Sequence, residues 1–86
     1  METYDITLRS ADPVDLGDLG ADGFEELLRA TLDCDFTWKQ DAEGRIGVNF
    51  RHEATDAGRA YGAAEAVAGN LGTAVWTVSV AQDARH

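Results

Sequence analysis

The chain has 86 residues, of which 16 are Asp or Glu and 7 are Lys or Arg, so its formal net charge is −9 at pH 7. This length supports one small domain, and a hydrophobic fraction of 44% is typical of a folded globule rather than a disordered chain. The excess of acid disfavours direct nucleic-acid binding, because phosphate contacts need a basic surface.

The sequence contains no recognisable membrane-spanning or targeting segment and only one cysteine. No run of apolar residues is long enough for a membrane span, and the N-terminus lacks the apolar core of a signal peptide, so a cytoplasmic protein is expected. Cys34 is the single cysteine, which excludes an intrachain disulfide.

The first predicted element is a strand over residues 3–9, where apolar and polar side chains alternate with the period of a half-buried strand. Residues 10–22 contain the only proline and two glycines and predict an acidic loop. Asp22, followed three residues later by Glu25, approximates a capping box for a helix over about 23–33. The apolar stripe of that helix consists of Phe24, Leu27, Leu28, Thr31 and Leu32.

A hairpin is predicted next. Residues 36–39 and 46–52 both alternate, and Asp41-Ala42-Glu43-Gly44 between them provides a turn with a glycine for positive φ. Thr55 or Asp56 then caps a second helix, which ends in Gly69-Asn70-Leu71-Gly72. Its small-residue stripe consists of Ala57, Ala60, Tyr61, Ala64, Val67, Ala68 and Leu71.

Gly58, Gly62, Ala66 and Gly69 run along another side of this helix, and close packing within the chain is the default expectation for them. A last strand follows over residues 75–80. The element order is therefore β-α-β-β-α-β. Right-handed crossovers place both helices on one face of an antiparallel sheet with strand order 4-1-3-2.

This α+β two-layer arrangement resembles the ferredoxin-like superfold over about residues 3–81. The whole chain, 1–86, is expected to form a single domain with a short C-terminal tail at 82–86. Because this superfold hosts many unrelated functions, the resemblance selects none of them.

The chemical inventory of the chain predicts no catalytic, cofactor or metal site. The aspartates of the first loop match a calcium-binding loop poorly, since Arg29 stands where a bidentate glutamate is required. Cys34 lies between two aspartates, which disfavours a thiolate and indicates a structural cysteine. His52 shares the apolar face of its strand and is interpreted as a partly buried packing residue.

Two surfaces remain as candidates. The helix-free face of the sheet would present many short polar groups and three bases, and its candidate interaction residues are Arg9, Lys39, Asn49, Arg51 and Thr77. This face lacks the aromatic residues of an RNA-binding sheet. The candidate acidic surface consists of Asp12, Asp15, Asp18, Glu25 and Glu26.

The leading hypothesis is a non-enzymatic protein-interaction module that acts as an adaptor, regulator or inhibitor. Its size and charge would suit an antitoxin, an immunity protein or an anti-defence protein that occupies a basic surface of its partner. A second hypothesis is a homodimeric ligand-binding or enzyme domain with an anion pocket between protomers. A third is a structural subunit whose edge strand is extended by a partner strand.

Overall fold

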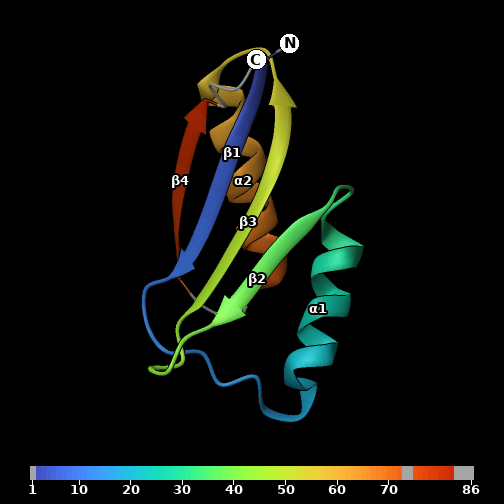
Figure 1. Ribbon diagram of the computed structural model, residues 1–86, viewed down its shortest axis with the longest axis vertical. Helices are drawn as coiled ribbons and strands as arrows, with labels where there is room; N and C mark the ends of the chain where they lie inside the picture. Colours follow the sequence, from blue (N-terminus) through green and yellow to red (C-terminus); the bar gives the residue numbers. More distant parts are fainter. Residues whose placement is uncertain (1, 73–74, 83–86) are drawn as a thin grey trace.

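The computed structural model describes residues 2–72 and 75–82, which form a four-stranded antiparallel sheet with two α-helices on one face (Figure 1). The strand order β2-β3-β1-β4 is the predicted order read from the opposite edge, so the class, the element order and the sheet topology are confirmed. The elements are β1 (Glu2–Ser10), the 3₁₀ turn η1 (Gly17–Leu19), α1 (Gly20–Thr31), β2 (Phe36–Gln40), β3 (Ile46–Ala54), α2 (Ala57–Leu71) and β4 (Trp76–Gln82).

The strand register places the apolar side chains on one face. Leu8 of β1 lies opposite Val48 of β3 on one side and opposite Val78 of β4 on the other. Ile6, Leu8, Ile46 and Val48 are fully buried under the helices. Because successive strand residues point to opposite faces, the polar residues between them are directed away from the helices.

Helix α1 covers the β2 side of this core. Phe24 and Leu28, four residues apart on its predicted stripe, are fully buried. The ring of Phe24 meets Trp38 of β2 edge to face, with 4.9 Å between ring centroids. The indole Nε1 of Trp38 donates to Glu25 Oε1 at 3.4 Å, so one turn of α1 holds both the ring and its polar end.

The predicted capping box at the start of α1 is wrong, because the helix begins earlier, at Gly20, and Asp22 lies inside its first turn. Asp15 Oδ1 accepts the Gly17 N–H at 2.9 Å and starts the 3₁₀ turn, which runs directly into α1. The acidic loop predicted over 10–22 is therefore helical from Gly17 onward. Asp22 favours the helix only through its negative charge near the N-terminus.

Helix α2 covers the other half of the sheet. Of the two predicted capping residues, Thr55 and Asp56, Asp56 is the N-cap and accepts the Arg59 N–H at 2.9 Å. The helix ends at Leu71, and Gly72 adopts the left-handed conformation with φ 61°. The packed part of its stripe is narrower than predicted, because Ala57 and Tyr61 are exposed. Ala60, Ala64 and Leu71 are buried, and Val67 and Ala68 pack against the core while partly exposed.

The predicted close packing of the glycines of α2 within the chain is also wrong. Gly62 and Gly69 are exposed, and a Cβ on either would meet no atom within 4 Å. The helix packs on the sheet through its alanine stripe, which directs these glycines to the opposite side.

The strands are longer than their sequence patterns indicate. Strand β3 continues to Ala54, because Glu53 and Ala54 pair with Thr3 and Glu2 of β1. Gln82, assigned by prediction to the C-terminal tail, is the last residue of β4, while residues 83–86 of that tail lie outside the described residues. Within the described ranges, neither helix combines the length and the apolar character needed to cross a membrane.

We expect Phe24→Ala to lower the free energy of unfolding by about 3–5 kcal/mol, because it empties a fully buried site and removes the edge-to-face contact with Trp38. Urea denaturation followed by tryptophan fluorescence measures this loss. Glu26→Ala, at an exposed position on the same helix, is the control, and a comparable loss there would contradict the assignment.

Candidate functional site

The sheet face opposite the helices is polar and uncovered within the described part of the chain (Figure 1). The strand register arranges its side chains in rows across the strands. Lys39, Gly47, Arg9 and Thr77 form one row, and Thr37, Asn49, Thr7 and Ser79 form the next.

A shallow hollow of about 860 Å³ lies on this face. Gly47 is in the middle of its first row and has no side chain, and a Cβ built there would meet nothing within 4 Å. The hollow is therefore open because this strand position has no side chain; a β-branched residue at position 47 would fill it. Its lining is Thr7, Arg9, Ser10, Thr37, Trp38, Lys39, Asp41, Arg45, Ile46, Gly47, Val48, Asn49 and Thr77.

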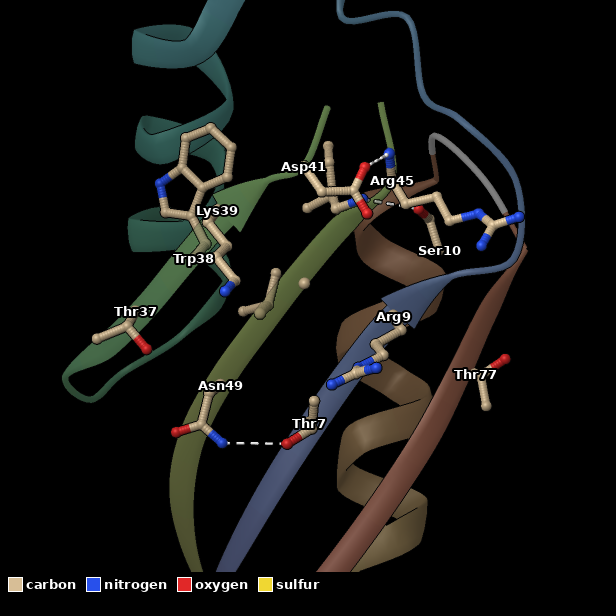
Figure 2. Close-up of a pocket in the computed structure, with 13 residues that line it drawn as sticks. Thr7, Arg9, Ser10, Thr37, Trp38, Lys39, Asp41, Arg45, Asn49 and Thr77 are labelled. Carbon is tan, nitrogen blue, oxygen red and sulfur yellow. Dashed lines mark hydrogen bonds between the residues drawn. The ribbon is translucent and has the colours of Figure 1, made fainter. Parts of the chain in front are cut away.

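Two cations flank Gly47. Figure 2 shows Lys39 of β2 and Arg9 of β1 on either side of β3, with their charged ends directed toward it. Both residues are exposed, and within residues 2–72 and 75–82 neither has an ion-pair or hydrogen-bond partner. A third cation, Arg45, lies at the end of the hollow, where its side chain points outward to Glu43 at 3.6 Å.

The polar floor of the hollow is held in place by Asn49. Its Nδ2 group donates to Asp5 Oδ1 at 2.7 Å and lies 3.1 Å from Thr7 Oγ1 and 3.2 Å from the carbonyl of Ile6. These contacts keep the amide flat against β1, and they orient the Asp5 carboxylate toward Asn49. The side chains of Asn49, Asp5 and Thr7 are therefore preorganised, because hydrogen bonds within the chain hold their rotamers.

The β2–β3 hairpin closes one end of the hollow. Asp41 Oδ1 accepts the backbone N–H groups of Glu43 and Arg45 at 2.9 and 3.0 Å, and Gly44 turns the chain with φ 92°. Gln40 Nε2 donates to the carbonyls of Val14 and Gly44, which ties the loop after β1 to the hairpin. The negative charge of Asp41 is thus partly balanced by two backbone donors.

Ser10 positions the strand that carries Gly47. Its buried Oγ accepts the Ile46 N–H at 2.9 Å, one residue beyond the last backbone pair of β1 with β3. The hydroxyl thus accepts a hydrogen bond from a buried N–H of β3 for which the backbone of β1 provides no acceptor. The start of β3 is thereby held beside the end of β1, where Arg9 lies opposite Gly47.

Four of the five predicted interaction residues line the hollow: Arg9, Lys39, Asn49 and Thr77. Arg51 shares the face but lies outside the hollow, opposite Asp5. The extension of β3 also adds Glu53 to this face, opposite Thr3. The basic character of the face is therefore concentrated around Gly47.

The predicted acidic surface is less uniform. Asp15 is engaged in the turn before α1, and Glu25 makes a 3.0 Å ion pair with Arg29. Asp12, Asp18 and Glu26 are exposed, and they are spread over the first loop, η1 and α1.

The other chemistry-bearing residues do not assemble. No cluster of three or more metal-ligating side chains occurs among the residues that the structure describes. Cys34 is exposed rather than packed in the core, and partial desolvation, Asp35 and Asp33 raise the pKa of its thiol. His52 is partly buried, as expected of a packing residue.

The hollow itself was missed by sequence reasoning. Its central feature, Gly47, interrupts an otherwise regular β-branched and aromatic strand pattern. An isolated glycine inside a strand often marks a position of close approach, so this signal was available. The hairpin residues Asp41 and Arg45 carried no comparable signal, because their position depends on the strand pairing.

No protein-family model, curated protein or solved structure matches this chain.

We expect Ser10→Ala to destabilise the domain by about 1–3 kcal/mol, because the buried N–H of Ile46 loses its acceptor. The change is measured by urea denaturation. Ser79→Ala, at an exposed strand position, is the matched control and should change stability by less than about 0.5 kcal/mol. Equal effects of the two substitutions would refute the role assigned to Ser10.

Proposed function

We propose that this domain is a non-enzymatic protein-interaction module whose open sheet face binds an acidic segment of another protein. The observation that carries the proposal is the pair of exposed cations, Arg9 and Lys39, that flank Gly47 over the hollow. In a chain with 16 acids and 7 bases, two cations that no carboxylate of the described residues neutralises are available for a ligand.

The net charge of −9 does not prevent this interaction. At physiological ionic strength the Debye length is about 8 Å, so an anion in the hollow interacts mainly with nearby charges. Asp41, which lines the hollow, already accepts hydrogen bonds from the hairpin backbone, and Asp5 accepts one from the lining residue Asn49.

The spacing of the cations suits an extended acidic segment. Lys39 and Arg9 are on strands separated by one strand, so their backbones are about 10 Å apart and their side chains lean toward each other. Alternate residues of an extended peptide point to one side about 7 Å apart. Two carboxylates at such positions can meet the two cations, while Thr7, Thr37 and Thr77 provide hydroxyls between and beside them.

The alternative in which the acidic surface contacts a basic partner has less support, because Asp15 and Glu25 already have contacts within the chain. A non-enzymatic role is favoured because the hollow pairs no nucleophile with a histidine or other base: His52 belongs to the opposite face. We also infer that the domain is of the ferredoxin-like type, on the basis of its element order and strand order.

We expect a fluorescent peptide of alternating Glu and Ser to bind the protein at low salt, and its Gln-Ser counterpart not to bind. Arg9→Ala and Lys39→Ala should each weaken binding about threefold to tenfold, since each removes one charge-assisted contact. Arg59→Ala, on the exposed side of α2, is the control. Fluorescence anisotropy measures the affinities, and equal losses in all three variants would argue against the hollow as the site.

Gly47→Val provides a second test of the same site. A Cβ at Gly47 meets no atom, and valine is favoured in strands, so the stability of the domain should be retained or raised. The isopropyl group would fill the hollow and should reduce binding of the Glu-Ser peptide at least tenfold. Undiminished binding by the folded variant, checked by circular dichroism and anisotropy, would contradict the proposed site.

A further inference from the structure

Strand β4 is an outer strand of the sheet and has the properties of an unprotected edge (Figure 1). The segment 75–82 contains no ionisable side chain and no proline. Natural edge strands are usually kept from pairing by charges, prolines or short length. The opposite edge has such protection, because β2 is only five residues long and carries Lys39.

The hydrogen bonds between β1 and β4 show which backbone groups of β4 point away from β1. The Ala11 N–H donates to the Val75 carbonyl at 2.9 Å, which marks that position as a hydrogen-bonded pair. Because such pairs alternate along an antiparallel ladder, the odd-numbered residues of β4 bond to β1. The N–H and C=O groups of Trp76, Val78, Val80 and Gln82 therefore point outward.

The charge distribution favours a second copy of this chain as the occupant. Eight of the 16 acids lie between residues 10 and 35, with one base, Arg29. Residues 57–82, which contain α2 and β4, carry one Arg and one Glu. Glu2 adjoins this half at the end of β4, where it accepts a hydrogen bond from Gln82 Nε2 at 2.7 Å. Two molecules of net charge −9 can therefore approach through this half with less repulsion than through the acid-rich segment 10–35.

The same half of the molecule also exposes apolar surface. Two of the three large hydrophobic residues exposed within the described part of the chain, Tyr61 on α2 and Val75 before β4, lie there. Trp76, Val78 and Val80 are only partly buried by α2. A further strand and helix beside β4 would extend the apolar layer over Trp76, Val78 and Val80.

We propose that β4 pairs antiparallel with β4 of a second copy, with Ser79 at the two-fold axis. In this register Val78 lies opposite Val80 of the partner and Trp76 opposite Gln82 of the partner, so all four outward residues of each strand are paired. Opposed residues of an antiparallel pair share a face, so the partly buried apolar side chains of both copies join one layer. The result is a continuous eight-stranded sheet with both polar hollows on the same side.

The register is tested by cysteine cross-linking in a Cys34→Ser background, which removes the exposed native thiol. Ser79 is exposed, so its replacement leaves the core intact. At the two-fold axis it forms a non-hydrogen-bonded pair with about 4.5 Å between Cα atoms, which is within the range for a disulfide. Ser79→Cys should therefore give a reducible dimer under mild oxidation.

Thr77→Cys is the matched control, because Thr77 would face Ala81 of the partner and lie about 13 Å along the strand from its own copy. It should cross-link at least tenfold more slowly than Ser79→Cys. Sedimentation velocity of the wild-type chain should show a concentration-dependent dimer, and Ser79→Lys should weaken it about fivefold through like charges at the axis. A monomer at every concentration, or equal cross-linking of the two cysteine variants, would overturn the proposal.

Discussion

Strands β1 and β3 pair from Glu2 opposite Ala54 to Arg9 opposite Gly47, and the rest of the domain depends on this register. A shift of one residue in either strand would turn its whole buried set outward and bring its polar set under the helices. For β1 the exchange would bury Asp5 and Arg9 in place of Ile6 and Leu8, which are fully buried here. Burying an unpaired charge costs a large amount of free energy, and a shifted register offers no contact that would offset it. The observed register is therefore strongly preferred.

The core and the candidate binding face are consequences of the same pairing. Ile46 and Val48 point into the helix layer, and Gly47 between them opens the hollow on the other side. The register that brings Val48 opposite Leu8 also brings Gly47 opposite Arg9. Right-handed crossovers pack both helices against the apolar face of the sheet, and the polar face is left uncovered by the residues that the structure describes. Charge is distributed unequally over these elements, since the acid-rich segment 10–35 contains α1, which packs on β2, and the nearly neutral segment 57–82 contains α2 and β4.

Local physical chemistry predicted the features that depend on neighbouring residues. Asp56 caps α2 and Gly72 ends it, because both roles need only the adjacent backbone. The prediction for Asp22 failed because Gly17 and Gly20 allow a 3₁₀ turn that starts the helix earlier. The prediction for the α2 glycines failed for another reason. The spacing of small residues gives α2 two sides that could pack closely, and the sheet determines which of them it contacts.

The sequence by itself determined the element order, the apolar face of each strand and of α1, and the unequal distribution of charge, because each depends on residues a few positions apart. The site was decided only by the tertiary structure. Arg9, Lys39 and Gly47 are on three different strands, and the hydrogen bonds of Ser10, Gln40 and Asp41 link the segments around them. Strand pairing joins positions that are remote in sequence, so the two cations and the gap between them form a single surface only in the folded sheet.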